Sequence, residues 1–227
     1  MIPAWNAERY LGEAIESVLG QTVPVDSIVV VDDGSTDTTV AVARRYPSVR
    51  VIQQAHAGAG AARNRGVTDT TEARLAFLDA DDIWAPRKLE HQLPRLEEPG
   101  VDVVFGLVQN FLSPDMADEL DRIDFERRPL RGFSPSALVV SRVAWEHVGP
   151  FATGEPLTDW VDWYLRLQER DIGVAVVGEV VVHRRVHGGN ETMRDPLART
   201  AYVRLVKHAL DRRRRQATQP PVGSWEH

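Results

Sequence analysis

The feature that most constrains the fold is a repeated order of buried strand, acidic turn and helix. Residues 27–31 hold a continuous β-branched run, too short for a helix and typical of a strand buried on both faces. Asp32 and Asp33 end this run in a turn, and a helical pattern follows. A second apolar run, at 75–78, stops in the same way at the acidic residues of 79–82. This alternation predicts a doubly wound, mostly parallel α/β sheet flanked by helices, with right-handed crossovers.

The rest of the chain continues this alternation of short elements. Further strands are expected at 49–53, 101–107, 137–140, 174–177 and 180–182. Helices are expected at 7–21 and from Ser35 or Thr36 through 45, and a short helix is expected to end near 66. Further helices are expected at 86–96, 141–147, 158–170 and 196–215. Asn6, Ser35, Thr36 and Thr158 have the side chains of N-caps. Residues 2–6 resemble a strand end and a turn, so we expect a first strand that is only a stub, or a chain truncated at its front.

The length favours one globular domain with a short tail. The 227 residues suffice for one sizeable core. We expect a single domain at 1–215, with halves at 1–107 and 108–195 and a final helix. Residues 216–227 are expected to form a disordered tail, and the polar, charge-mixed stretch 113–128 a mobile or variable insert.

Composition excludes several classes of function. The 27 basic and 33 acidic residues give a formal net charge of −6, which argues against a basic surface for nucleic acid. The chain has no cysteine, so disulfides, thiolate metal sites and cysteine nucleophiles are excluded. No apolar run approaches the roughly 20 residues that span a bilayer, and the first residues lack a signal-peptide pattern, so we expect a cytoplasmic protein without a transmembrane segment.

Two acidic turns are expected at one edge of the sheet. Both follow the carboxyl end of a strand, where open α/β sheets bind ligands. Asp79, Asp81 and Asp82 offer hard oxygen ligands, which suit Mg²⁺ or Mn²⁺ bound together with substrate phosphates. An acidic turn that only caps the helix beginning at Pro86 is the alternative. The second turn, at Asp33, favours the metal, because a cation offsets the repulsion between two negative clusters.

The glycine-rich stretch at 58–66 is a weaker candidate for binding. Its backbone amides, with Arg63 or Arg65, could approach phosphates. The stretch has neither the Gly-Lys-Ser/Thr of a P-loop nor the spacing of a dinucleotide-binding motif. A tight turn with solvated arginines is therefore the alternative.

Two later segments could supply a base and a metal ligand. Asp159 and Asp162 open a predicted helix beside Trp160 and Trp163. Acids in a first helical turn are ordinarily there because they interact favourably with the helix dipole. Alternatively, a neighbouring apolar side chain would raise the pKa of one of them toward neutrality, as suits a general base. His187 lies in a glycine-rich segment after two arginines, where a metal ligand with phosphate-facing arginines and a solvated loop are the two interpretations.

Four motifs occur in a fixed order and resemble a known family. They are Ile-Pro-Ala-Trp-Asn at 2–6, Val-Val-Asp-Asp-Gly-Ser-Thr-Asp at 30–37, Ala-Ala-Arg-Asn-Arg-Gly at 61–66 and Phe-Leu-Asp-Ala-Asp-Asp at 77–82. Together they resemble the family 2 glycosyltransferases of the GT-A fold. The resemblance implies a Rossmann-like half that binds a nucleotide-sugar, at 1–107, and an acceptor-side half, at 108–195. It also implies an inverting transfer of sugar from a nucleoside diphosphate to an acceptor hydroxyl, with Mn²⁺ or Mg²⁺.

The resemblance assigns the donor site residue by residue. The residues expected against the nucleoside are Pro3, Ala4 and Trp5. Asp33 would hydrogen-bond the base, which is most often uracil in the family. Arg63 would support the base and phosphate side, and Asp79 the ribose and donor.

The resemblance also assigns the metal site and the base. Asp81 would be the direct metal ligand, and His187 matches the family's C-terminal histidine near the metal and diphosphate. Family members usually place the base in a Glu-Asp pair ahead of a helix. Aligned on its Leu-Arg-Leu stretch, this chain has Asp159 at the Glu position, Trp160 at the base position and Asp162 at the next acidic position. We expect Asp159 first, and Asp162 second, to act as the base.

Because this chain has Trp160 where the family's base is expected, a second function stays open. A catalytically impaired nucleotide-sugar-binding protein on the same fold is the alternative to an enzyme. A nucleotidyltransferase with a related sheet is disfavoured, since the sequence shows no Gly-rich, basic triphosphate loop near its start. The sequence does not identify the acceptor, which could be a saccharide, a lipid-linked hydroxyl or a natural-product or peptide hydroxyl. We expect it to contact 113–133 and the tryptophans near Asp159.

Overall fold

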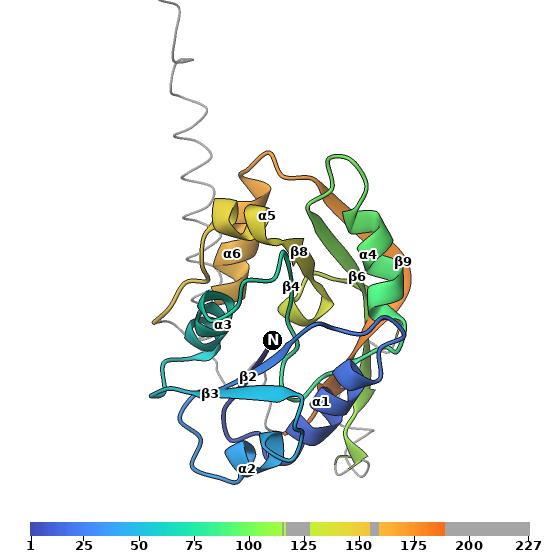
Figure 1. Cartoon of the computed structure of the whole chain (residues 1–227). Coiled ribbons are helices and arrows are strands. Elements are labelled where there is room, and N and C mark those ends of the chain that lie inside the picture. The colour runs from blue at the N-terminus through green and yellow to red at the C-terminus, as the bar shows by residue number, and fades with distance from the viewer. Residues whose placement is uncertain (115, 117–127, 155–158, 189–227) are drawn as a thin grey trace, which may run out of the picture.

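The computed structural model describes residues 1–114, 116, 128–154 and 159–188. Its strands are β1 (Ile2–Ala4), β2 (Ile28–Asp32), β3 (Val49–Gln53), β4 (Arg74–Ala76), β5 (Ile83–Trp84), β6 (Val103–Leu112), β7 (Leu130–Gly132), β8 (Val139–Ser141) and β9 (Val174–Val186). Its helices are α1 (Leu11–Leu19), α2 (Thr39–Ala43), α3 (Ala59–Thr68), α4 (Lys88–Leu96), the 3₁₀ helix η2 (Pro135–Ala137), α5 (Arg142–Val148) and α6 (Asp159–Gln168). Figure 1 shows α3, α5 and α6 on one side of the molecule and α1 and α4 on the other, with strands between them.

The first sheet is parallel, in the order β1-β2-β3. All five residues of β2 are buried, and its four apolar residues alternate between two cores. Ile28 and Val30 belong to the core on the α1 side, whereas Val29 and Val31 pack with Ala62 of α3. Because helices cover both faces, β2 needs no polar position, which explains its β-branched run. The three-residue β1 is the strand end that the sequence indicated at 2–6.

The second sheet is mixed. Its order is β4-β8-β6-β9-β5, with β7 paired to β6. Strands β6 and β9 run parallel, and the other pairs are antiparallel. The prediction of two strands at 174–177 and 180–182 is wrong, because β9 is one strand of 13 residues. Its register with β6 shifts between Phe105 and Leu107, so Gly178 and Glu179 fall in a bulge that does not end the strand.

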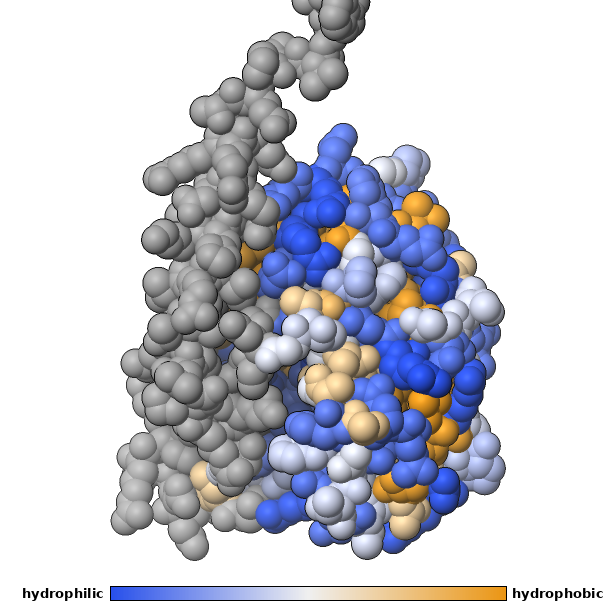
Figure 2. All heavy atoms as spheres, turned by 90° about the vertical axis from the view of Figure 1, so that its left-hand side faces the viewer, coloured by the Kyte–Doolittle hydropathy of each residue, from blue (hydrophilic) through white to orange (hydrophobic). Residues whose placement is uncertain are grey.

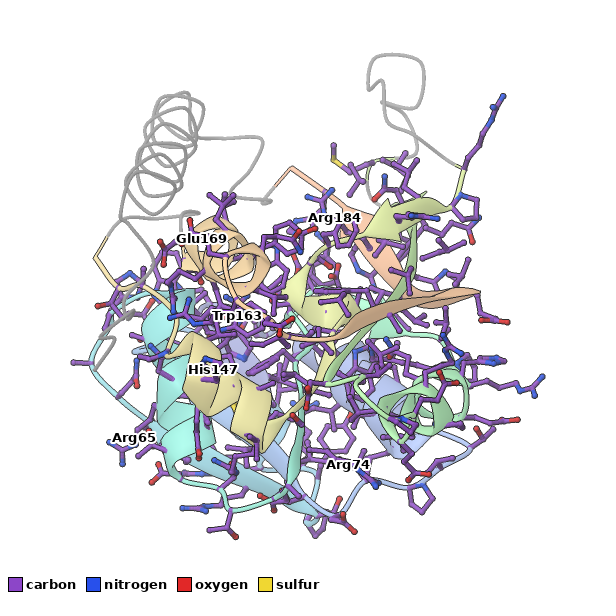
Figure 3. All side chains as sticks on the ribbon, turned by 90° about the horizontal axis from the view of Figure 1, so that it is seen from above. Arg65, Arg74, His147, Trp163, Glu169 and Arg184 are labelled. Carbon is purple, nitrogen blue, oxygen red and sulfur yellow. The ribbon has the colours of Figure 1, made fainter. Side chains whose placement is uncertain are left out.

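Alternate residues of β6 also face opposite cores. Phe105 shares a core with Trp163 of α6, and Val104 shares the other core with Leu89 of α4. Figure 3 shows Trp163 lying inward from α6, and its side chain is fully buried. Truncating a buried tryptophan costs about 3–5 kcal/mol. This burial therefore holds α6 firmly where the helix begins at Asp159.

The turns after β1 and β2 are tied to each other. Asn6 Oδ1 accepts a hydrogen bond from Thr36 N at 2.8 Å, and Asn6 N donates to Ser35 Oγ at 2.9 Å. The capping roles predicted for these three residues are wrong, because α1 begins only at Leu11 and α2 at Thr39. Instead, the three residues fix two carboxyl-end turns side by side at one edge of the sheet.

Some expected features cannot be compared with the structure. Thr158, the helix at 196–215, the tail at 216–227 and most of the insert at 113–128 lie outside the described residues. Within the described part of the chain, no helix has the length and apolar character to cross a membrane. The described residues visible in Figure 2 are mainly hydrophilic, with hydrophobic residues in small groups.

Candidate functional site

Arg63 joins two of the predicted site residues. It lies on α3 and is only 5% exposed. Its Nη1 donates to Asp159 Oδ2 at 2.7 Å, and its Nη2 donates to Asp79 Oδ1 at 2.5 Å. Arg65, the other arginine of this motif, lies at the outer surface in Figure 3 and pairs with Asp69 at 2.6 Å. Of the two arginines, Arg63 therefore faces the acidic turn, and it brings an acid of α6 to that turn.

Helices α3 and α6 approach closely because Gly60 has no side chain. A Cβ at Gly60 would lie 2.6 Å from Ala152 O and 2.8 Å from Asp159 Cβ. Asn64, one turn later on α3, exchanges two hydrogen bonds of 2.9 Å with the backbone of Phe151. Gly60 and Asn64 of this motif thus allow the start of α6 to lie beside Arg63.

Asp81 and His187, the two predicted metal ligands, lie together. Asp81 Oδ2 is 3.0 Å from His187 Nε2. The His187 ring also packs on Tyr10, with ring centroids 4.8 Å apart. Over the described ranges, no group of three histidine, cysteine or acidic side chains is placed to hold a metal ion. The structure thus brings together a partly exposed carboxylate and a largely buried imidazole at this turn.

Asp82 is the buried member of the acidic turn. Its Oδ1 accepts a hydrogen bond from Arg185 N at 3.1 Å, and its Oδ2 accepts one from Ser136 Oγ at 3.0 Å. Burial raises the pKa of Asp82 well above its usual value, and the charges of Asp81 and Asp79 act in the same direction. The two hydrogen bonds act against this shift, because they stabilise the ionised carboxylate.

Arg185 is enclosed by protein. Its Nε donates to Asp81 O at 3.1 Å, and its Nη2 donates to Glu13 Oε2 at 2.6 Å. Its guanidinium carbon lies 4.5 Å from the ring centroid of Tyr10 and 4.7 Å from that of Phe111. The sequence suggested phosphate-facing arginines in this segment, but Arg185 instead braces the acidic turn against α1 and β6.

Asp33 is buried and surrounded by donors. It is 2% exposed, and its Oδ1 accepts hydrogen bonds from Gln54 Nε2 at 2.7 Å and Ala57 N at 2.9 Å. Its Oδ2 accepts one from Gly58 N at 2.8 Å and lies 2.9 Å from His56 Nδ1. A carboxylate has about four acceptor positions, so Asp33 fixes the loop after β3. The predicted contact of Asp33 with a base stays a prediction.

Trp5 presents an exposed aromatic face beside this loop. It is 48% exposed and stacks on His56, with ring centroids 4.7 Å apart and an interplanar angle of 29°. Pro3 and Ala4 are buried in β1, and Ala4 O accepts a hydrogen bond from Asp33 N at 2.8 Å. Of the three residues predicted to contact a nucleoside, Trp5 is thus the exposed one.

Asp162 has a structural partner. Its Oδ2 accepts a hydrogen bond from Arg166 Nε at 2.8 Å. Arg166 also donates to Val148 O at 2.5 Å and to Pro150 O at 2.6 Å. This ion pair fastens α6 to the end of α5, whereas Asp159 faces Arg63 and the acidic turn.

Comparison with known proteins gives the family. The pattern of "Glycosyl transferase family 2" matches residues 1–139. An uncharacterised glycosyltransferase of Rickettsia typhi is 30% identical over 207 residues, which cover 85% of this chain and 64% of the relative. An uncharacterised glycosyltransferase of a Nostoc species is 30% identical over 214 residues, which cover 85% of this chain and 66% of the relative. The chain thus spans just under two thirds of the length of these relatives.

Solved structures give the fold. Residues 1–349 of Staphylococcus aureus TarS, in complex with UDP-GlcNAc, align with a TM-score of 0.74 at 17% identity, covering 92% of this chain and 64% of that one. Glucosyl-3-phosphoglycerate synthase from Mycobacterium tuberculosis, in complex with Mn²⁺, UDP and phosphoglyceric acid, aligns with a TM-score of 0.66 at 21% identity, covering 92% and 76%. The architecture is the GT-A fold. The chain belongs to glycosyl transferase family 2, as its four ordered motifs indicated.

Proposed function

We propose that this chain is an inverting glycosyltransferase that moves a sugar from a nucleoside diphosphate donor to an acceptor hydroxyl with Mn²⁺ or Mg²⁺. The observation that carries the proposal is the bridge from Arg63 to both Asp159 and Asp79, with the pair of Asp81 and His187 at the same turn. The acidic turn at 79–82 would then lie beside both the catalytic base and the metal-bound donor. The UDP and UDP-GlcNAc complexes of the structural relatives support UDP as the first nucleotide to test.

The residues at the turn fit a divalent cation. Asp81 supplies a hard oxygen and His187 an imidazole nitrogen, 3.0 Å apart. Mg²⁺ is commonly held by one or two protein carboxylates together with substrate phosphates and water, and imidazole nitrogen also binds first-row metals. A cation here would offset the negative charge that develops on the departing diphosphate.

Asp159 is the base that the geometry favours. It would take the proton of the acceptor hydroxyl while the hydroxyl oxygen bonds to the anomeric carbon and the bond from that carbon to the diphosphate breaks on the opposite face. Arg63 orients the Asp159 carboxylate toward the acidic turn. Asp162 is bound to Arg166 instead. Trp160, at the family's usual base position, donates its Nε1 to a backbone carbonyl at 2.6 Å and packs among aromatic rings.

The nucleoside would lie on the exposed face of Trp5. The stack of Trp5 on His56 offers a flat surface beside the loop that Asp33 fixes. Nucleobases stack on such aromatic faces for about 1–3 kcal/mol per base. This placement puts the diphosphate on the side of the acidic turn, since both turns follow strands at the same edge of the fold.

The experiment compares two acids of α6. We expect Asp159→Asn to lower metal-dependent release of UDP from a UDP-sugar at least about 100-fold, the usual size of a general-base contribution, while UDP affinity in Mn²⁺ stays within about 3-fold. Asp162→Asn is the matched control and should keep most of the activity. Equal turnover by wild type and Asp159→Asn would show that Asp159 is not the base.

The alternative is a catalytically impaired nucleotide-sugar-binding protein, motivated by the acid displaced from the usual Glu-Asp pair. UDP-, GDP- and dTDP-sugars, each with Mn²⁺, Mg²⁺ or chelator, separate the two functions. Metal-dependent release of a nucleoside diphosphate supports the enzyme. Tight donor binding without release from any donor supports the alternative.

A further inference from the structure

Ser136 touches both ends of the acidic turn, although it lies more than 50 residues further along the chain. Its side chain is fully buried. Its Oγ accepts a hydrogen bond from Asp79 N at 3.1 Å and donates to Asp82 Oδ2 at 3.0 Å. A hydroxyl has one hydrogen to donate, so these two contacts assign its roles: the proton goes to the carboxylate and a lone pair to the amide.

The element that carries Ser136 is held independently of the turn. Ser136 is the middle residue of η2, which begins with Pro135. Gln92 Nε2 donates to Ala137 O at 2.9 Å and to a carbonyl of β6 at 3.0 Å. Trp84 Nε1 donates to Ser136 O at 3.1 Å. The serine therefore sits on a braced support and can impose its position on the turn.

The turn needs such a support because it crowds three carboxylates. Asp79 faces Arg63, Asp81 faces His187, and Asp82 points into the protein. Without the hydroxyl, Asp82 Oδ2 would lose a buried hydrogen bond and Asp79 N a partly buried one, and polar groups left without a partner inside a protein destabilise the arrangement that holds them. The turn would relieve this cost by changing its backbone, which would move Asp79 and Asp81 together.

We propose that Ser136 is a positioning residue that sets Asp79 and Asp81 for the metal and the donor diphosphate. This role rests on the proposed function, since it concerns the same site. Residues that orient metal ligands from behind typically contribute 10–100-fold to metal affinity. We therefore expect Ser136→Ala to weaken Mn²⁺ binding in the presence of UDP about 10-fold or more.

The test measures Mn²⁺ binding to the full chain with UDP by electron paramagnetic resonance, and melting temperature alongside. Ser141→Ala is the matched control, because Ser141 Oγ also makes two hydrogen bonds, with Ala144 N and Asp102 Oδ1, but lies at the far end of β8. We expect both variants to melt lower and only Ser136→Ala to lose Mn²⁺ affinity. Ser136→Cys, which leaves no cavity but offers only a weak donor, should lose affinity in the same direction.

Three results decide the matter. Lost Mn²⁺ affinity in Ser136→Ala or Ser136→Cys, with Ser141→Ala like wild type, supports the role. Wild-type affinity in every Ser136 variant that folds overturns it and leaves the proposed function intact. A wild-type chain that binds no Mn²⁺ with UDP overturns the proposed function and this role together.

Discussion

The two acidic turns are built in different ways. Asp33 is held by residues of one short segment, 54–58, which follows the neighbouring strand β3. The turn at 79–82 is held by Arg63 from α3, by Ser136 from η2 and by the segment after 184. The Asp33 carboxylate is therefore held by one segment of the chain, and the second turn is held by several separate segments.

We expect this difference to separate donor binding from chemistry. A local loop can keep its shape when the rest of the molecule relaxes, which suits a platform for a nucleobase. The second turn depends on how α3, α6 and β9 pack on the mixed sheet, so a small shift in any of them changes the distances among Asp79, Asp81 and Asp159. We expect substitutions at the first turn to act mainly on donor affinity and those at the second mainly on turnover.

The largest effect is expected for Arg63→Met. Removing one partner of a buried ion pair costs about 3–5 kcal/mol, and here the loss leaves the Asp79 and Asp159 carboxylates facing each other. We expect lower stability by denaturant unfolding and at least about 100-fold slower UDP release. Arg65→Met is the control, because the exposed pair of Arg65 with Asp69 contributes at most about 1 kcal/mol. Similar stability in the two variants would contradict the bridging role.

A smaller loss is expected for Asp33→Asn. The amide keeps the shape but replaces one acceptor oxygen with a donor nitrogen, so contacts with Gly58 N or Ala57 N are lost. Hydrogen bonds to a charged group contribute about 1.5–3 kcal/mol. We expect the loop to loosen and the KM for the donor to rise about 10-fold with little change in kcat. A fall in kcat without a change in KM would contradict the division between the two turns.

The same division explains what the sequence could predict. The acids at 32–33 and 79–82, Arg63 and His187 stood out because each belongs to a motif that is contiguous in the chain. The parallel order of the first strands is confirmed for β1 to β3, whereas β4, the strand ahead of 79–82, is assigned to the second sheet and pairs with β8. The mixed order of the second sheet carries no comparable signal, because antiparallel pairing of β8 with both β4 and β6 depends on contacts across 30 residues or more.

Ser136 and Arg185 show the limit most clearly. A serine after a proline is typical of any turn, and an arginine near a strand end is typically solvated. Their roles arise only when η2 and β9 fold back over the acidic turn. The choice between Asp159 and Asp162 also depends on contacts between distant segments. Both lie in the first turn of α6, but Asp159 pairs with Arg63 of α3, whereas Asp162 pairs with Arg166 of its own helix.

Gly60→Ala tests the long-range assembly without removing any charge. The new Cβ would lie 2.6 Å from Ala152 O and 2.8 Å from Asp159 Cβ, so α3 and α6 must move apart. Overpacking of this kind typically costs about 1–3 kcal/mol. We expect turnover to fall while Mn²⁺ affinity, which depends on Asp81, stays near wild type. Gly178→Ala, with open space around the new Cβ, is the control and should behave like wild type.

The smallest effect, and one of opposite sign, is expected for Lys88→Met. Lys88 is fully buried, its Nζ donates to Gln92 Oε1 at 2.6 Å and lies over the Trp84 ring. Burial lowers the pKa of Lys88 well below its usual value. Between the lowered pKa and about 10.5 the unfolded chain binds more protons than the folded one, so the stability of the wild type rises with pH in that window.

Methionine fills nearly the same volume and carries no charge, so Lys88→Met should remove this pH dependence and raise stability at neutral pH by about 0–2 kcal/mol. Urea unfolding at several pH values measures both changes. A variant less stable than wild type at neutral pH would mean that the Lys88 contacts with Gln92 and Trp84 outweigh the cost of burying the ammonium. The core beside α4 would then depend on buried polar contacts, as the acidic turn at 79–82 does.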